Sequence, residues 1–263
     1  MTLRSRLSRL ARTVLPARST EADHTAAPAV AQRPTPDAVD GVKLNLGCGF
    51  DVRSGWVNVD MHERHGPEIV SDVTDLRDIA DKTASYALAQ DVLEHVHRDR
   101  CATALREWNR VLKPGGLLDL RVPDVIALGR LMQQRQSVEQ HAVLLQCMFG
   151  TQGYQGDFHL NGFTELSISA ALEDAGFTVE YLGHHDEWLL DVVGRKDRDT
   201  QPDPMLRAET DADFITLAYR RFLGREPDPE GREYYLGSLA EGIPREAVMA
   251  TLDYAGRQQG ASG

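Results

Sequence analysis

The chain has 263 residues, 26% of them charged, and a formal net charge of -11 at pH 7. This length is sufficient for one large and one small domain, each with its own core. The negative charge argues against a nucleic-acid substrate, because proteins that bind a phosphate backbone favour a basic surface. No apolar run approaches the roughly 18 residues that a membrane-spanning helix needs.

Three cysteines, Cys48, Cys101 and Cys147, show neither metal-ligand spacing nor the even number of a disulfide framework. A reduced cytoplasmic protein is the simplest interpretation. No compact cluster of metal-ligating residues stands out in the sequence, so the sequence names no metal ligands and leaves metal dependence open.

Residues 1–40 differ in composition from the rest. Five arginines precede the first acidic residue, Glu21, and apolar residues recur among them at helical spacing. This pattern indicates a short basic amphipathic helix that contacts an anionic membrane surface or a partner. The alternative is a disordered tail, which the Ala-, Pro- and Thr-rich stretch from Ser19 to Pro36 favours. The segment lacks the long apolar run of a secretory signal, so we expect a cytoplasmic protein, with contact at the inner membrane as the variant.

The first strong signal is an apolar run that ends in a glycine turn. Leu44 and Leu46 alternate with polar residues, which predicts a short buried strand. Gly47 and Gly49 then let the backbone turn sharply and approach a ligand closely. The run from Trp56 to Val59 predicts a second strand.

Asp60 ends this second strand. Its carboxylate can accept hydrogen bonds from both hydroxyls of a ribose. Ligands bind at the carboxyl ends of adjacent parallel strands in α/β sheets, so the glycine turn and Asp60 together predict a nucleoside site.

Further strand and helix signals follow along the chain. Residues 68–73 and 85–90 predict two further strands, and a helical stretch runs to Leu112. The sequence Lys113-Pro114-Gly115-Gly116 breaks that helix, and residues 117–123 resume a strand.

The order of these segments resembles the class I S-adenosylmethionine-dependent methyltransferases, and most of all a small bacterial branch associated with glycan assembly. The matching pieces are Leu46-Gly47-Cys48-Gly49, Asp60, Asp72-Val73, Leu93-Glu94-His95-Val96 and Arg110-Val111-Leu112-Lys113-Pro114-Gly115-Gly116. The resemblance covers about residues 41–196. It implies an α/β fold with a Rossmann-like methyltransferase sheet, mostly parallel with an antiparallel last strand, and S-adenosylmethionine as cofactor.

The resemblance also implies roles for particular residues. The methionine part of the cofactor would lie along Leu46, Gly47, Cys48 and Gly49. Asp60 would bind the ribose hydroxyls, and Asp72 with the Val73 amide would meet the adenine edge. Gln90 and Asp91 would border the methyl-transfer site. The chain departs from the family pattern in two ways. Asp51 stands where many members have a third glycine, and only six residues separate Gly49 from Trp56. The first helix is therefore expected to be very short or replaced by a loop.

A hydroxyl acceptor must lose a proton during methyl transfer, so we searched for a base. His159 is the first candidate, because it lies in the glycine- and polar-rich loop 150–159, which is expected to lie over the carboxyl ends of the strands. His95 and Asp91 come next, although His95 serves equally well as a local packing residue. His184 and His185 are expected to be solvated, in a hairpin turn; metal binding together with Asp186 is the less favoured alternative.

The remaining elements complete the expected sheet. Residues 125–149 read as helical, and Thr164 is expected to cap a helix that Gly176 ends. Residues 177–182 and 188–193 alternate apolar and polar side chains around a turn, as in a terminal hairpin.

The C-terminal part has a different character. We predict a linker at 197–210 and a small all-α module at 211–258, after the methyltransferase domain at 41–196. The phrase Tyr219-Arg220-Arg221-Phe222-Leu223-Gly224-Arg225-Glu226-Pro227-Asp228 resembles a phycobilisome-linker-like helical module of unassigned function. The module either binds a glycan or a partner such as a glycosyltransferase, or covers the enzyme and mediates self-association.

The Asp-Pro-Pro-Tyr type of motif that marks amino-group methyltransferases is absent after the fourth strand, which favours an oxygen or carbon acceptor. The resemblance therefore leads us to expect O-methylation of a sugar of a bacterial surface glycan, lipopolysaccharide or another polysaccharide. The first alternative is a methyltransferase for a small aromatic or lipid-like metabolite. The second is a catalytically idle cofactor-binding scaffold in a glycan-assembly complex.

Overall fold

A computed structural model describes residues 33–154 and 156–260. The expected basic helix and most of the predicted tail at 1–40 lie outside these described residues. The chain divides into two compact units, Met1–Thr200 and Gln201–Gly263, which are described separately below.

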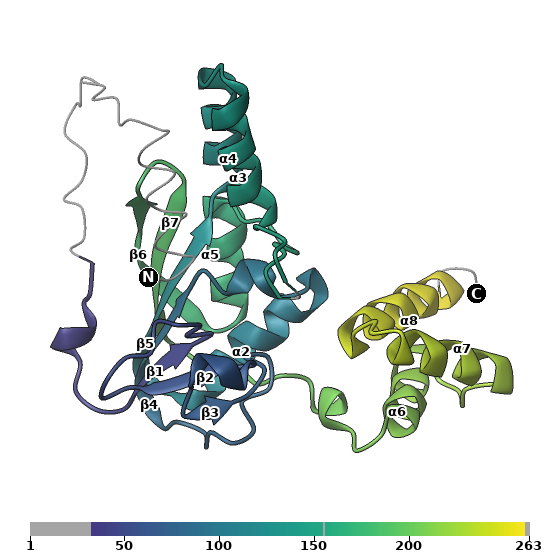
Figure 1. The fold of residues 1–263 in the computed structure, drawn as a ribbon. Coiled ribbons are helices and arrows are strands. Elements are labelled where there is room, and N and C mark those ends of the chain that lie inside the picture. Colours follow the sequence, from purple (N-terminus) through teal and green to yellow (C-terminus); the bar gives the residue numbers. More distant parts are fainter. Residues whose placement is uncertain (1–32, 155, 261–263) are drawn as a thin grey trace. The chain divides into compact units, whose positions relative to one another are not determined.

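The first unit is built on a seven-stranded sheet with the order β3-β2-β1-β4-β5-β7-β6 (Figure 1). The strands are β1 Lys43–Leu46, β2 Val57–Asp60, β3 Ile69–Val70, β4 Ala84–Gln90, β5 Leu112–Pro123, β6 Phe177–His185 and β7 Leu189–Lys196. The pairs among β1 to β5 are parallel, whereas β7 is antiparallel to both β5 and β6. This arrangement confirms the predicted Rossmann-like sheet with an antiparallel last strand.

Strand boundaries follow the sequence signals with two differences. β3 has only two residues, fewer than the run 68–73 predicts. β5 already begins at Leu112, because a shift in its register against β4, between Ala84 and Tyr86, absorbs the segment 113–116. The expectation that this segment separates helix from strand is therefore wrong; a bulge inside the sheet accommodates it.

Helices connect the later strands of the sheet. They are α2 Cys101–Val111, α3 Val125–Gln134, α4 Val138–Phe149 and α5 Glu165–Asp174, with 3₁₀ turns η1 Pro36–Ala38, η2 Glu63–His65, η3 Leu93–His95 and η4 Arg98–Arg100. The connection from β1 to β2 contains no helix, as the short spacing predicts.

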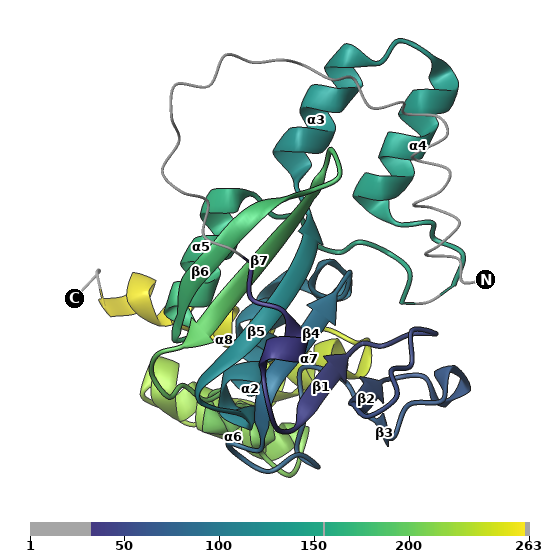
Figure 2. The same ribbon diagram turned by 90° about the vertical axis from the view of Figure 1, so that its left-hand side faces the viewer.

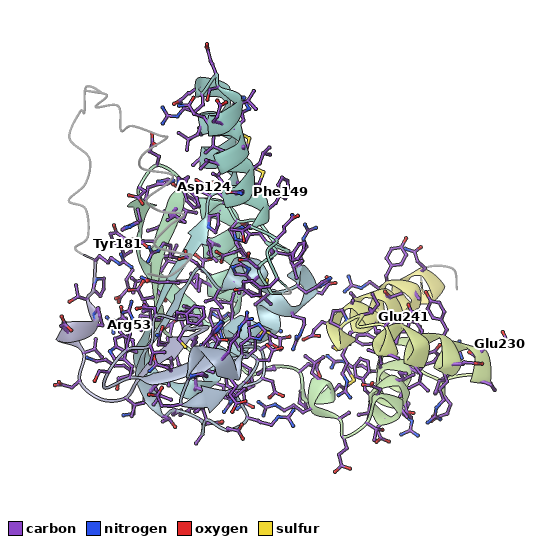
Figure 3. All side chains as sticks on the ribbon, viewed as in Figure 1. Arg53, Asp124, Phe149, Tyr181, Glu230 and Glu241 are labelled. Carbon is purple, nitrogen blue, oxygen red and sulfur yellow. The ribbon has the colours of Figure 1, made fainter. Side chains whose placement is uncertain are left out.

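The expected single helix over 125–149 is in fact two. Arg135 is extended and ends α3, and the Ser137 hydroxyl accepts a hydrogen bond from the Gln140 amide to begin α4. Figure 2 shows α3 and α4 side by side beyond the carboxyl end of the sheet. Asp124 and Phe149, labelled in Figure 3, lie at the ends of this helical hairpin that are nearer the sheet.

The main core lies between one face of the sheet and helices α2 and α5. Fully buried Trp108 and Leu105 of α2 and Ile168 and Leu172 of α5 pack on the apolar side chains of β1, β4 and β5. The predicted Thr164 cap of α5 is present, with a reciprocal bond from Ser167. The opposite face has a smaller cluster of Tyr86, Leu88, Leu117 and Val193.

The second unit contains η5 Pro204–Arg207 and three helices, α6 Asp211–Leu223, α7 Pro229–Ala240 and α8 Arg245–Gly260. Glu230 and Glu241 mark the two ends of α7 in Figure 3. Phe214, Ile215 and Ala218 of α6 and Val248 and Leu252 of α8 form its core, together with Met205 of η5 and Tyr219. Across the described residues of both units, no helix combines the length and apolar character needed to span a membrane.

Candidate active site

The carboxyl ends of β1 and β4 lie at the point where the strand order of the sheet reverses. Chain connections leave the sheet in opposite directions here, and α/β sheets bind their ligands in the resulting crevice. Most of the predicted site residues follow one of these strand ends.

The glycine turn after β1 has the backbone that only glycine adopts readily. Gly47 and Gly49 have φ angles of 60° and 51°. A Cβ atom on Gly47 would lie 2.6 Å from Cγ2 of Val92, so even alanine does not fit without displacement. The Cys48 amide donates to the Val59 carbonyl at 3.0 Å, which fixes the turn to β2.

Asp60 is buried, and its carboxylate organises the turn. One oxygen accepts from the Gly49 amide at 2.8 Å, and the other accepts from the His62 amide at 2.8 Å and from His65 Nδ1 at 2.9 Å. The His65 ring lies edge-on to Phe50, with centroids 4.5 Å apart. The oxygen that meets Gly49 keeps a second lone pair for a ligand hydroxyl.

Asp72 is held in place by its neighbours. One of its oxygens accepts from the amide and hydroxyl of Thr74, and the other pairs with Arg100 Nη1 at 2.9 Å. Burial alone would raise the pKa of Asp72, but the charge of Arg100 and the bonds from Thr74 outweigh it, so its pKa lies below the ordinary value. The Val73 carbonyl accepts from the Trp108 indole at 2.9 Å.

At the end of β4, Gln90 is followed by a residue with unusual backbone geometry. Asp91 has a φ of 56°, in the left-handed region that non-glycine residues rarely adopt. Its amide donates to the Arg121 carbonyl at 3.0 Å, and its carboxylate lies 3.9 Å from Arg121 Nε. Such backbone geometry persists only where the surroundings impose it.

The loop after α4 is tied to η3. The amides of Leu160 and Asn161 both donate to the Glu94 carbonyl, and His95 Nδ1 lies 3.1 Å from the Phe158 carbonyl. These contacts bring His159 against His95, with ring centroids 4.7 Å apart.

The same contacts assemble a group that the sequence does not reveal. Ligand atoms of Glu94, His95 and His159 all lie within 4.8 Å of one another. This group does not stand out in the sequence because the fold, and not the sequence spacing, brings its members together.

His159 is a partly buried imidazole with one buried polar atom that lacks a partner among the described residues. Its Nδ1 is inaccessible to solvent and has no hydrogen-bond partner among the described residues. Burial lowers the pKa of His159 below 6.5, while nearby backbone carbonyls and the charges of Asp157 and Asp91 act in the opposite direction. The ring is consequently neutral at pH 7 and has a nitrogen lone pair to offer.

The loop also reaches the segment after β2. The Arg64 guanidinium lies 4.8 Å from the centre of the Tyr154 ring, and the His62 and Tyr154 rings are 6.2 Å apart. Four exposed apolar side chains surround this region: Phe50, Met61, Tyr154 and Phe158. The loop therefore contacts both the Asp60 side and the His95 side of the strand ends.

His184 and His185 are not in a hairpin turn, as β6 continues to His185. His184 Nε2 lies 3.1 Å from an Asp124 oxygen, and His185 Nδ1 lies 3.5 Å from an Asp191 oxygen. The longer strand gives the two histidines separate carboxylate partners, while both side chains stay partly exposed, as expected.

Three residues of the site escaped the sequence analysis as functional candidates: His62, His65 and Glu94. His65 and His62 have no motif signal, because only the turn at η2 brings them to Asp60. Glu94 stands in the matched phrase Leu93-Glu94-His95-Val96, which was the one available signal.

Family models match a segment of each unit. Residues 44–119 match the family model described as a methyltransferase domain, and residues 206–254 match a domain of unknown function, DUF4214. No curated protein matches the chain significantly.

Solved structures with a similar fold come from several organisms. One is a SAM-dependent methyltransferase from Methanosarcina mazei, with 19% identity over 60% of this chain and 93% of that one and a TM-score of 0.46. Another is an S-adenosylmethionine-dependent methyltransferase from Mesorhizobium loti, with 17% identity over 61% and 93% and a TM-score of 0.45. A third is the Burkholderia thailandensis 1,6-didemethyltoxoflavin-N1-methyltransferase, solved with S-adenosylhomocysteine, with 18% identity over 61% and 73% and a TM-score of 0.42.

The family match covers the glycine turn, Asp60, Asp72 and the β4 end, and the sheet has the strand order of that fold. Residues 44–119 are therefore similar to a methyltransferase domain, and S-adenosylmethionine is the cofactor that this similarity supports.

Proposed function

We propose that the protein methylates a hydroxyl oxygen, and that the acceptor is a sugar of a bacterial surface glycan. The observation that carries the reaction class is the meeting of Asp91, His95 and His159 beside the glycine turn. Three groups able to accept a proton gather where the cofactor's methyl group is expected.

The chain's own residues suit the cofactor. The turn formed by Leu46, Gly47, Cys48 and Gly49 offers backbone without obstructing side chains to the methionine end. Asp60 offers an oxygen lone pair to the ribose, and Asp72 with the Val73 amide meets the adenine edge. Gln90 borders the methyl-transfer position. When bound, S-adenosylmethionine supplies a methyl group that its sulfonium charge already activates.

The protein must then align an acceptor, exclude water and remove one proton. His159 is the first candidate for the base, because its pKa is lowered by burial and its ring is neutral at pH 7. His95 Nδ1 lies against the Phe158 carbonyl, which can only accept a hydrogen bond, so the proton is on Nδ1 and the lone pair on Nε2. Asp91 supplies a carboxylate at the same end of the sheet.

A second acceptor class has its own supporting observation. Phe50, Met61 and Phe158 expose apolar surface around the site, which suits a small aromatic or lipid-like metabolite. The glycan acceptor is supported by the resemblance of residues 41–196 to the glycan-associated branch. A scaffold that binds the cofactor without turnover is the remaining alternative.

The test is release of S-adenosylhomocysteine from S-adenosylmethionine by the full chain, with lipopolysaccharide-derived oligosaccharides in one arm and phenolic and fatty hydroxy compounds in the other. Turnover confined to the saccharides supports the proposal. Turnover confined to the aromatic or lipid-like compounds moves the acceptor to the second class. Cofactor binding without release in any arm contradicts the enzyme and supports the scaffold.

A further inference from the structure

We propose that Glu94, His95 and His159 form a binding site for a divalent transition-metal ion. Two histidines and one carboxylate are the donors that zinc, iron(II), cobalt(II) and manganese(II) accept in proteins, and three protein ligands leave positions open for substrate. Elsewhere in the described residues, no other group of three His, Cys, Asp or Glu side chains brings its ligand atoms this close together.

The spacing is close to that of a bound site. The ligand atoms lie within 4.8 Å of one another. Two atoms that each bind zinc at about 2.1 Å in tetrahedral geometry lie about 3.4 Å apart. Ion binding therefore requires the side chains to move closer by roughly 1 Å, within a loop already tied to η3 through the Glu94 carbonyl.

His95 has the hydrogen bond that a metal-binding histidine needs. Its Nδ1 proton points to the Phe158 carbonyl at 3.1 Å, so Nε2 carries the lone pair. Metal-binding histidines commonly donate their second ring nitrogen to a backbone carbonyl, which fixes both the tautomer and the orientation of the ring.

His159 supplies an observation that does not depend on the spacing of the ligand atoms. Its Nδ1 is buried and has no hydrogen-bond partner among the described residues, which is costly unless a ligand satisfies it. The nearby carboxylates of Asp91 and Asp157 add negative charge that favours a cation.

The role of the ion rests on the proposed methyltransferase function, whereas its binding does not. The open positions would hold one or two acceptor oxygens beside the methyl group and lower the pKa of the bound hydroxyl. The acceptor oxygen then gains the methyl carbon, the carbon–sulfur bond breaks with its electron pair left on sulfur, and the hydroxyl proton passes to Asp91. With the ion bound, His159 would act as a ligand, so the role of base, for which it is the first candidate in the metal-free site, would pass to Asp91.

Binding is tested with Co²⁺ added to the full chain after dialysis against a chelator, followed by visible absorption and calorimetry. We expect about one Co²⁺ per chain, and an affinity at least tenfold weaker in His159→Asn and in His95→Asn. His184→Asn, which changes a histidine of another site, is the matched control and should bind as the native chain does. Urea unfolding checks that each variant is folded. Absence of Co²⁺ binding by the native chain, or unchanged affinity in both site variants, overturns the proposal.

The role of the ion is tested by turnover on an acceptor identified as above. We expect the metal-free chain to bind S-adenosylhomocysteine normally, to transfer methyl groups at least a hundredfold more slowly, and to recover on addition of Co²⁺ or Mn²⁺. Full turnover by the metal-free chain overturns this role and leaves the methyltransferase proposal intact. If the metal-loaded native chain does not bind S-adenosylhomocysteine, the methyltransferase proposal is contradicted. Co²⁺ binding then stands as a separate result.

Discussion

The two sides of the site are built differently. On the β1–β2 side, every oxygen of the Asp60 carboxylate already accepts a hydrogen bond from the protein, and the glycine turn is fixed between Val92 and Val59. On the η3 side, His159 has a buried nitrogen without a partner, and Asp91 has a left-handed backbone. The polar atoms of the first side are already paired within the protein, whereas the second side leaves a buried polar atom for a ligand to satisfy.

The contrast has a cause in the chain itself. The cofactor side comes from successive strand ends and a short turn, so neighbours in sequence satisfy one another. The acceptor side forms when the loop after α4 docks on η3, which joins distant segments. Substitutions on the two sides should therefore act on different measurements: cofactor affinity for the first and turnover for the second.

The largest effect is expected from Gly47→Ala. The new Cβ would lie 2.6 Å from Val92, at a φ of 60°, so the turn must move. We expect the affinity for S-adenosylhomocysteine to fall at least a hundredfold, about 2.7 kcal/mol, by calorimetry. Gly55→Ala is the matched control, because Gly55 also has a positive φ but no atom within 4 Å of a new Cβ. Equal losses of affinity in both variants would show that the positive φ angle causes the loss, and that the close packing of Gly47 on Val92 does not.

His159→Asn should change turnover and not cofactor binding. We expect kcat to fall about a hundredfold, the usual contribution of a positioned proton acceptor or metal ligand, with an unchanged Kd for S-adenosylhomocysteine. If the affinity for S-adenosylhomocysteine fell as much as kcat, His159 would act on cofactor binding as well, which would contradict separate roles for the two sides.

The same histidine predicts a pH dependence. The pKa of His159 in the folded protein is lowered below 6.5, so the folded state holds the ring neutral. Activity should be full at pH 7 and decline as the pH falls through this lowered pKa. Stability should decline as well once the pH drops below the ordinary histidine pKa, because the unfolded chain then binds the proton more readily. In urea titrations, His159→Asn should weaken this pH dependence, and an unchanged profile would mean that His159 is not its source.

His65→Ala should have a moderate effect confined to the cofactor side. It removes a 2.9 Å bond to Asp60 and the contact with Phe50. We expect a five- to tenfold weaker affinity for S-adenosylhomocysteine, about 1 to 1.4 kcal/mol, which is the size of a typical net hydrogen-bond contribution. His65→Asn keeps a donor and should recover part of the loss. Equal behaviour of the two variants would indicate that packing on Phe50 matters and the hydrogen bond does not.

The smallest effect is expected from Tyr154→Ala, at the contact between the two sides. The variant loses the stacking of Arg64 on the ring, worth about 0.5 to 1 kcal/mol at an exposed site. We expect KM for the acceptor to rise two- to fivefold with little change in kcat. Tyr234→Ala, at an exposed position of α7, is the control and should leave both constants unchanged.

Much of the fold follows from the sequence. Alternating apolar residues and glycine turns predict β1, β2 and β4, and Asp60 and Gln90 stand at strand ends because these patterns stop there. The helical pattern over 125–149 hides the break at Arg135 and Ser137, since a serine cap is a weak signal inside an apolar periodicity. β6 is longer than expected because the pairing of His184 and His185 with β7 extends the hairpin.

The site is predictable only where its residues are local. Gly47, Gly49 and Asp60 have a motif and a fixed relation to strand ends. The meeting of His159 with Glu94 and His95 depends on how the loop after α4 docks on η3, and no spacing in the sequence encodes that contact. The three hydrogen bonds on Asp60 are likewise a product of the η2 turn.

The cofactor assignment is tested most directly by calorimetric titration of S-adenosylhomocysteine into the full chain and into Asp60→Ala, with urea unfolding to confirm that the variant is folded. We predict micromolar binding by the native chain and at least a tenfold loss in the variant, about 1.4 kcal/mol. No binding by the native chain would contradict the account.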